Sequence, residues 1–143
     1  MQQLKIKKLN PQATLPRYGS AGAAAFDVCA LESGIIQPGS AATFTTGLAF
    51  DLPEGWHLLA FSRSGHGFRH GVRLSNSVGL IDSDYRGELK VRLQNDGWQP
   101  YRVQRGERIA QCMPVYAPQL ELIEVDDTSE TERGDGGFGS TGR

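Results

Sequence analysis

Long hydrophobic runs and an excess of one charge are both absent from this sequence of 143 residues. A membrane-spanning helix takes roughly 20 apolar residues, and the first ten positions alternate apolar and charged side chains instead of forming a signal peptide. Lysine and arginine number 15 against 16 aspartates and glutamates, so the chain lacks the basic face of a general nucleic-acid binder. We therefore expect a soluble, cytoplasmic protein without a membrane or nucleic-acid partner, although local arginines can still bind a small anion.

Cysteine is scarce, since Cys29 and Cys112 are the two in the chain and lie far apart. Each is flanked by apolar residues, so we interpret both as buried free thiols and not as a disulfide or metal-binding pair. Free thiols fit a reduced, cytosolic environment. A chain of this length suits one domain that buries about two-thirds of its unfolded surface, so it needs no disulfide or structural metal.

Amphipathic helices are also missing, because no window shows a convincing helix of three turns. Period-two alternation dominates instead, as where Leu89, Val91 and Leu93 alternate with polar residues. Further strands are predicted around Leu4 and Ile6 and at residues 25–31, 43–50, 57–61, 109–116 and 120–125. Many short strands separated by turns predict an all-β, jelly-roll-like barrel or sandwich over residues 1–125.

The character of the chain changes at residues 126–143, which are first acidic and then rich in glycine, serine and threonine. Such a composition cannot bury enough apolar surface to order itself. We expect a flexible C-terminal arm.

Two polar clusters lie in the first half of the chain. Asp27 is the one carboxylate in an apolar, strand-like stretch, which alone is typical of an ordinary strand. Arg63, Ser64 and Gly65 follow an apolar run and offer a guanidinium, a hydroxyl and free backbone N–H groups, so they form either an anion cradle or a plain solvent loop. For His66 and His70 a solvated or hydrogen-bonded histidine is the better interpretation than a metal site, because no third ligand has suitable spacing.

A third cluster runs from Asn76 through residues 78–88, where turn-prone residues separate two strand patterns. We interpret it as a β-hairpin whose backbone could pair with a planar base as a neighbouring strand would. Asp82 could take a proton from water as a general base. The alternatives are a charged surface hairpin, or Asp82 and Asp84 as direct Mg²⁺ ligands.

Two more clusters lie toward the C-terminus. Gln111 is a polar residue in an otherwise apolar strand, so its amide either forms hydrogen bonds between strands or contacts a ligand. Residues 133–142 combine glycines, hydroxyls and an arginine, which suits a phosphate-wrapping loop, although the lysine and helix of a Walker loop are lacking. The alternative is a disordered terminus, but Phe138 favours a stacking role.

Taken together, the order and spacing of these five clusters resemble the five motifs of the trimeric dUTPase family. The resemblance runs from Ala24 to Gly142 and is closest in residues 79–88 and 133–142. It implies a β jelly roll assembled as a homotrimer, with active sites between subunits and an arm that closes over a site not wholly its own. The implied reaction hydrolyses dUTP to dUMP and pyrophosphate, which limits uracil incorporation into DNA and supplies dUMP.

The resemblance also implies a role for each matched residue. Asp82 would activate the water that attacks the α-phosphorus, and Tyr85 would pack against the deoxyribose and exclude a 2′-hydroxyl. The remaining substrate contacts would fall into three groups: Asn76, Gly79, Leu80, Ile81 and Lys90 at the uracil; Arg63, Ser64, Gly65 and Gln111 on the phosphate chain; Arg133, Phe138, Gly139 and Ser140 on the arm. Mg²⁺ would sit on the substrate phosphates, with Asp27 reaching its hydration shell through water.

Three positions depart from the family pattern. Ala25 replaces a glycine, so either no positive φ is needed there or the strand shifts. Ser62 replaces a proline, which would loosen the Arg63 loop, and His66 replaces a commonly apolar residue.

Two other functions remain compatible with the sequence. One is a dCTP deaminase-like enzyme of the same fold, which would need a glutamate base. The other is a nucleotide-gated regulatory binding protein that acts through a partner.

Overall fold

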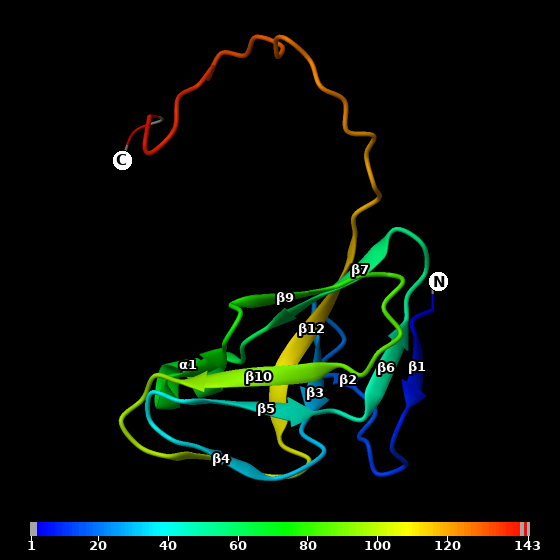
Figure 1. Cartoon of the computed structure of the whole chain (residues 1–143), viewed down its shortest axis with the longest axis vertical. Coiled ribbons are helices and arrows are strands. Elements are labelled where there is room, and N and C mark those ends of the chain that lie inside the picture. Colours follow the sequence, from blue (N-terminus) through cyan, green and yellow to red (C-terminus); the bar gives the residue numbers. More distant parts are fainter. Residues whose placement is uncertain (1–2, 141, 143) are drawn as a thin grey trace.

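A computed structural model describes residues 3–140 and 142. Met1, Gln2, Thr141 and Arg143, at the ends of the expected domain and arm, lie outside the described residues. The described part is all-β apart from one short helix (Figure 1). Its elements are β1 (Lys5–Lys8), β2 (Arg17–Tyr18), β3 (Phe26–Cys29), β4 (Gly34–Ile36), β5 (Ala41–Thr45), β6 (Leu48–Asp51), β7 (Trp56–Phe61), α1 (Ser64–His70), β8 (Val72–Leu74), β9 (Val78–Ile81), β10 (Lys90–Asn95), β11 (Tyr101–Val103) and β12 (Arg108–Tyr116).

The strands pair in antiparallel fashion and form layers around one apolar core. A five-stranded sheet has the order β2-β3-β12-β7-β9, and a three-stranded sheet has the order β5-β10-β8. Two-stranded pairs, β1-β6 and β11-β4, complete the domain. Leu58, Leu93 and Ile109, from β7, β10 and β12, are at most 1% exposed and join both larger sheets in a single core.

Strand prediction succeeded where one face of the strand is buried. In β10 the burial alternates residue by residue, because period-two side chains face the core and the solvent in turn. The strand predicted at residues 43–50 is divided into β5 and β6 by Gly47, whose φ is 69°. A Cβ at Gly47 would lie 2.9 Å from that of Ala13, so this turn depends on glycine.

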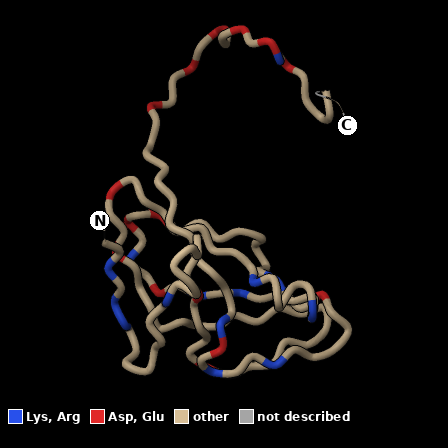
Figure 2. Tube along the Cα trace, turned by 180° about the vertical axis from the view of Figure 1, so that it is seen from behind, with Lys and Arg blue, Asp and Glu red and all other residues tan. Residues whose placement is uncertain are grey.

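The strand predicted at residues 120–125 is wrong. The structure describes all of these residues and assigns them no strand, and Leu120, Leu122 and Ile123 are 71–94% exposed. After β12 the chain leaves the domain (Figure 1), and acidic residues recur along this tail (Figure 2). An apolar alternation forms a sheet only when a neighbouring strand bonds to it, and no strand of the described residues pairs with this segment.

The β-hairpin predicted at residues 78–88 is also wrong, although its first strand exists. β9 pairs with β7, whereas β10 pairs with β5 and β8, so the connecting residues cross from one sheet to the other. In the order of its sheet β9 is terminal, and one of its edges therefore carries unpaired backbone groups.

Ser64 and Gly65, expected in an open loop, instead begin helix α1, whose N-cap residue is Arg63. No side chain caps the first turn, so its leading N–H groups have no partner within the helix. The helix ends at Gly71 and turns His66 inward, where it is 8% exposed.

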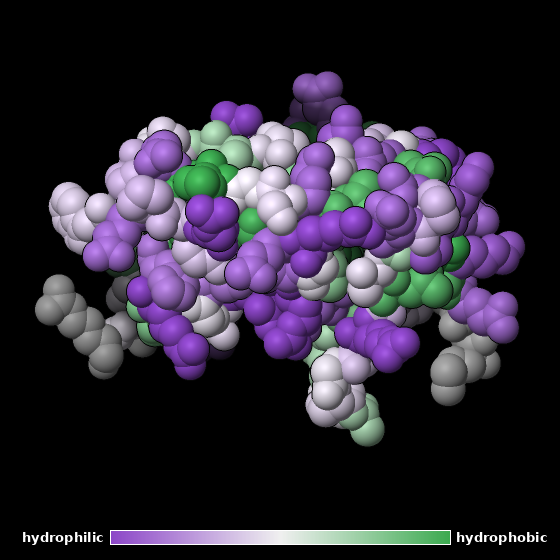
Figure 3. Space-filling view, turned by 90° about the horizontal axis from the view of Figure 1, so that it is seen from below, coloured by the Kyte–Doolittle hydropathy of each residue, from purple (hydrophilic) through white to green (hydrophobic). Residues whose placement is uncertain are grey.

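Polar and charged residues cover most of the face opposite the tail, with hydrophobic patches between them (Figure 3). Among the described residues, no helix combines the length and apolar character needed to span a membrane.

Candidate active site

A cavity of about 500 Å³ opens between β9 and β10, where the chain crosses between the two sheets. The structure brings together here six of the predicted substrate-binding residues: Asn76, Gly79, Leu80, Ile81, Tyr85 and Lys90. The volume lies within the range of small-molecule sites. Because β9 is terminal in its sheet, its unpaired backbone groups are available to a ligand in this space.

The crossing segment is fixed by two side chains that the sequence interpretation had not singled out. Arg86 donates to the Asp51 carboxylate at 2.8 Å and to the Ser83 carbonyl at 2.6 Å. Glu88 accepts the Gly47 N–H at 2.8 Å. Asp84, which the sequence offered only as an alternative Mg²⁺ ligand, is exposed and has no hydrogen bond or ion pair within the described part of the chain. The partners, the Asp51 carboxylate and the Gly47 N–H, lie 35 and 41 positions upstream, so sequence spacing gave no signal for this bracing.

Tyr85 lies across the end of this segment. Its backbone N–H donates to the Asp82 carbonyl at 3.2 Å, and its hydroxyl donates to the Glu88 carbonyl at 3.1 Å. A Cβ at Gly87 would lie 2.5 Å from Cζ of the Tyr85 ring, so only glycine lets the ring lie here. The phenol is thereby held at the mouth of the cavity.

Asp82 follows β9 directly, and its side chain is 63% exposed. The His57 ring lies beside it, with 3.7 Å between Asp82 Oδ1 and His57 Nδ1. Asp82 is thus a carboxylate open to water and held by few contacts. No group of three or more His, Cys, Asp or Glu side chains is arranged for a metal ion among residues 3–140 and 142.

A second polar cluster lies just beyond the end of β7. Arg63 Nε donates to Asp27 Oδ1 at 2.9 Å, and Arg108 Nη1 donates to Oδ2 of the same carboxylate at 3.1 Å. Gln111 lies opposite Asp27 in the β3–β12 pairing, and its amide donates to the Ser62 carbonyl at 2.9 Å. Three motifs that are distant in sequence therefore meet. Arg108 was missed as a member of the cluster, because only the β3–β12 register brings it to Asp27.

The departures at Ala25 and Ser62 have structural explanations. Ala25 is not among the described residues with positive φ, so this position tolerates a side chain. Ser62 Oγ accepts the Leu74 N–H at 2.8 Å, a bond that a proline side chain cannot accept. The serine therefore ties the start of the Arg63 segment to β8, and the expected loosening does not follow.

The two polar clusters are separated along one strand. Asp82 lies near His57 at the start of β7, whereas Arg63 follows its end, and a strand of six residues spans roughly 20 Å. A single phosphate group cannot contact both ends. One chain therefore presents two incomplete sites.

The arm residues are not brought to either cluster. Arg133, Phe138, Gly139 and Ser140 are exposed in the tail, which leads away from the domain (Figure 1). Arg133 Nε donates to the Gly136 carbonyl at 2.7 Å, and Phe138 has a φ of 48°. Thr141, also part of this motif, lies outside the described residues.

Neither cysteine is a candidate nucleophile. Cys112 is buried, and burial raises the pKa of its thiol to about 12. Cys29 is only half-buried, against expectation, and burial together with the nearby Asp27 carboxylate raises its pKa as well. Both thiols are free, as predicted.

His66 occupies a buried polar site behind the Arg63 segment. Its Nε2 lies 3.5 Å from Glu107 Oε1, which also accepts the Tyr101 hydroxyl at 2.8 Å. Burial lowers the pKa of His66, and the Glu107 carboxylate opposes this effect. Burial and the hydrogen bond to Glu107 raise the pKa of Tyr101.

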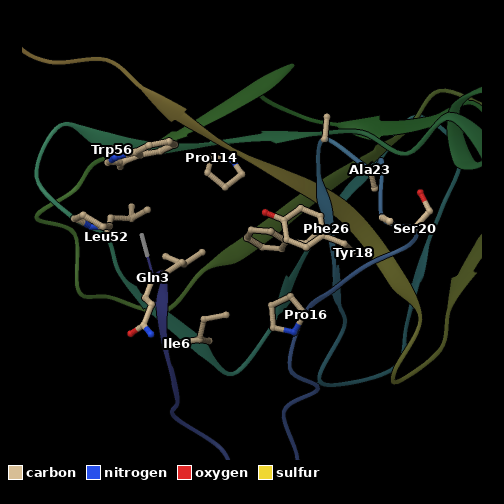
Figure 4. Close-up of a pocket in the computed structure, with 14 residues that line it drawn as sticks. Gln3, Ile6, Pro16, Tyr18, Ser20, Ala23, Phe26, Leu52, Trp56 and Pro114 are labelled. Carbon is tan, nitrogen blue, oxygen red and sulfur yellow. The ribbon is translucent and has the colours of Figure 1, made fainter. Parts of the chain in front are cut away.

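A larger cavity, of about 700 Å³, contains none of the predicted site residues. It is a mainly apolar groove lined by side chains that include Ile6, Phe26, Trp56 and Pro114 (Figure 4). The Trp56 indole nitrogen is buried without a hydrogen-bond partner in the described structure. The size of this groove does not make it the reactive site, since its lining includes no acidic, basic or cationic side chain.

A cavity along a free strand edge, combined with a cluster of arginines, defines a class of β protein suited to a planar base and an anion. The sequence matches the dUTPase family over residues 11–142, and the chain belongs to this family.

Similar proteins agree with that assignment. Deoxyuridine 5′-triphosphate nucleotidohydrolases of Nautilia profundicola and Wolinella succinogenes are each 48% identical over 141 residues, covering 99% of this chain and 99% and 95% of those proteins. The dUTPase of Staphylococcus bacteriophage 80alpha with dUpNHpp superposes with a TM-score of 0.92 at 29% identity, covering 100% of both chains.

Proposed function

We propose that this protein hydrolyses dUTP to dUMP and pyrophosphate, which limits uracil incorporation into DNA and supplies dUMP. The observation that carries the proposal is the cavity beside the free edge of β9, which gathers six residues matched to the family's substrate motif. Uracil has an edge on which carbonyl acceptors and an N–H donor lie side by side. The backbone from Gly79 to Asp82 would pair with this edge as a further strand would, and Asn76 and Lys90 would line the same space.

Tyr85 would select the sugar. Its hydroxyl is bonded to the Glu88 carbonyl, so the ring cannot turn aside without losing that bond. A deoxyribose packed on the ring leaves no room for a 2′-hydroxyl. UTP is then rejected by steric conflict.

Asp82 would act as the general base. It takes a proton from a water molecule while the water oxygen bonds to the α-phosphorus, and the bond from that phosphorus to the bridging oxygen breaks to release pyrophosphate. Its high exposure leaves it open to water. Positioning and charge neutralisation would supply most of the remaining rate enhancement.

Mg²⁺ suits this chemistry when it is bound through the substrate phosphates. A hard cation takes oxygen ligands and keeps much of its water, and a triphosphate offers such oxygens. When bound, Mg²⁺ would neutralise charge that develops on the phosphates. Asp27 is already held by two arginines, so any contact from it to the ion would pass through water.

We propose that the active sites are formed between subunits of a jelly-roll homotrimer. The separation of Asp82 from Arg63 by the length of β7 supports this, since a neighbour could bring Arg63, Ser64, Gly65 and Gln111 to the phosphates. The exposed apolar residues at 120–125 and the apolar groove also support contacts between copies of the chain.

In the expected division of the chain into a β domain at residues 1–125 and an arm at 126–143, the arm would close over the bound substrate. Arg133 and Ser140 would hold the terminal phosphates, Gly139 would let the backbone approach closely, and Phe138 would stack over uracil. The full exposure of the Phe138 ring leaves it free to do so. Two free thiols are consistent with a reduced, cytoplasmic setting.

The decisive experiment measures pyrophosphate and ammonia release from dUTP, dCTP, dTTP and UTP at equal concentration with Mg²⁺. We expect a high rate of pyrophosphate release from dUTP alone, since the pocket would select the base and the Tyr85 contact would select the sugar. Ammonia from dCTP without pyrophosphate from dUTP would show a deaminase instead. Binding of dUTP without any turnover would favour a regulatory binding protein.

A further inference from the structure

His57 lies between Asp82 and the residue where the tail leaves the domain. Its Nε2 is 3.1 Å from the carbonyl oxygen of Ala117, and its Nδ1 is 3.7 Å from Asp82 Oδ1. The side chain is 17% exposed, and Nδ1 is buried with no hydrogen-bond partner in the described structure. The histidine comes from β7, and sequence analysis gave it no role.

The Ala117 carbonyl determines which ring nitrogen carries the hydrogen. A carbonyl oxygen only accepts, so Nε2 must be the donor, and the neutral ring then presents a bare lone pair at Nδ1. This lone pair faces Asp82. An ionised carboxylate has no hydrogen to donate to it, whereas a protonated carboxyl group does.

We propose that His57 accepts the proton that Asp82 takes from the attacking water, and so restores the Asp82 carboxylate. This inference rests on the proposed function. Water gives its proton to Asp82 as the oxygen–phosphorus bond forms and pyrophosphate leaves. The same proton then passes from Asp82 to Nδ1 of His57, which becomes an imidazolium. Because Nδ1 is buried and Asp82 is exposed, the proton returns through the Asp82 carboxylate to solvent after the products have left. His57 therefore acts through Asp82 and is a positioning residue.

The geometry permits the transfer with a small movement. A distance of 3.7 Å suits an ion pair but exceeds a hydrogen bond. The His57 ring is held at its far side by Ala117, whose own N–H donates to the Gly55 carbonyl at 2.8 Å. Asp82 is the exposed partner, so a rotation of its side chain would close the gap. Across the sheet His57 faces Val115, which is apolar, and Asp82 is the ionisable group that the described structure pairs with the ring.

The test is a double-mutant cycle with His57→Gln and Asp82→Asn, measured as pyrophosphate release from dUTP under saturating and limiting substrate. Glutamine keeps an amide donor that can reach the Ala117 carbonyl but cannot take up a proton. We expect His57→Gln to lower kcat by roughly 10-fold or more with KM unchanged. In the Asp82→Asn background the same change should cost nothing further, because the group through which His57 acts is gone.

Other outcomes overturn the inference. If His57→Gln leaves kcat unchanged, or lowers it equally in both backgrounds, His57 has no role through Asp82. Binding of dUpNHpp and the melting temperature show whether each variant is folded, and His57→Asn enters the same cycle if His57→Gln does not fold. If Asp82→Asn itself turns over dUTP like the wild type, the proposed base is wrong as well. Loss of the His57 effect alone, with Asp82→Asn still impaired, leaves the proposed function intact.

Discussion

Two aspartates lie near opposite ends of β7 and have different surroundings. Near its start, the Asp82 side chain is 63% exposed and lies 3.7 Å from one histidine. Near its end, the Asp27 side chain is 19% exposed and forms ion pairs with two arginines. Asp27 lies within β3 between apolar residues, and Asp82 directly follows the apolar end of β9. Asp27 has an arginine on each oxygen, so its charge is neutralised and its geometry is fixed. Asp82 has neither.

The difference shows how one strand can separate two tasks. A carboxylate with a guanidinium group on each oxygen is a good anchor, so Asp27 orients Arg63 and Arg108. A carboxylate with free lone pairs in water can accept a proton. The two polar clusters therefore correspond to a positioning end and a reacting end, and each prediction below changes one of them.

The largest effect is expected at the reacting end. Asp82→Asn should lower kcat by roughly 10²–10⁴-fold, the usual contribution of a general base, with little change in KM. Steady-state pyrophosphate release measures it. Asp84→Asn is the matched control, because Asp84 is exposed and unbonded in the described structure, and it should resemble the wild type. Equal losses in both variants would mean that overall charge, and not Asp82, matters.

Removal of residues 133–143 should have the next largest effect. Without the arm, neither Arg133 nor Phe138 can close over the substrate, and we expect roughly a 10²-fold loss of turnover, comparable to losing preorganised donors from an active site. Circular dichroism and light scattering should show an unchanged fold and assembly, since residues 133–140 make no part of the core. Wild-type turnover in the truncated protein would exclude a lid.

At the positioning end, Asp27→Asn should act on stability and KM. The change breaks two ion pairs that are partly buried, and after allowance for their exposure it should cost about 1–2 kcal/mol of unfolding free energy. Urea unfolding measures this cost. Because Arg63 loses its orientation, KM for dUTP should also rise.

Asp96→Asn provides the comparison for Asp27→Asn. Its pair with Arg73 is shorter, at 2.6 Å, but both side chains are about half exposed, so less than about 1 kcal/mol should be lost. If the two variants have equal unfolding free energies, the Asp27 ion pairs stabilise the fold no more than a surface ion pair does.

The smallest effect concerns His66, behind the positioning end. Burial lowers its pKa in the folded state, so the unfolded chain binds the proton more tightly. The neutral histidine thus contributes stability that is present above the unfolded pKa, near 6.5, and is lost as pH falls through the folded value. Thermal melting of the wild type at fixed protein concentration should therefore fall between pH 7 and pH 5.

His66→Leu should flatten this pH dependence by at most about 3 °C, the shift that roughly 1 kcal/mol makes at this size. An apolar side chain has no proton to bind at this site. An identical pH slope in the variant and the wild type would assign the effect to other groups.

Sequence analysis predicted β10 because one of its faces lies in the core and its polar and apolar residues alternate. It predicted β7 and β12 because they are short apolar runs bounded by turn residues. It failed at residues 120–125, where an alternating pattern has no partner strand among residues 3–140 and 142. It also failed at the segment after β9, because the choice between a hairpin and a crossing depends on which strand edges are free. The residues of the β9 cavity were predicted by their motif, but the bracing by Arg86 and Glu88 was not.

By itself, the sequence determined the all-β character, the family and the types of residue at each motif, because these depend on local periodicity and on short runs of adjacent residues. Tertiary structure decided which carboxylate is anchored and which is free. That outcome depends on the β3–β12 and β7–β9 pairings, which bring Arg63 and Arg108 to Asp27 and leave Asp82 beside His57. Long-range register is set by packing of the whole core, so no spacing within a motif could reveal it.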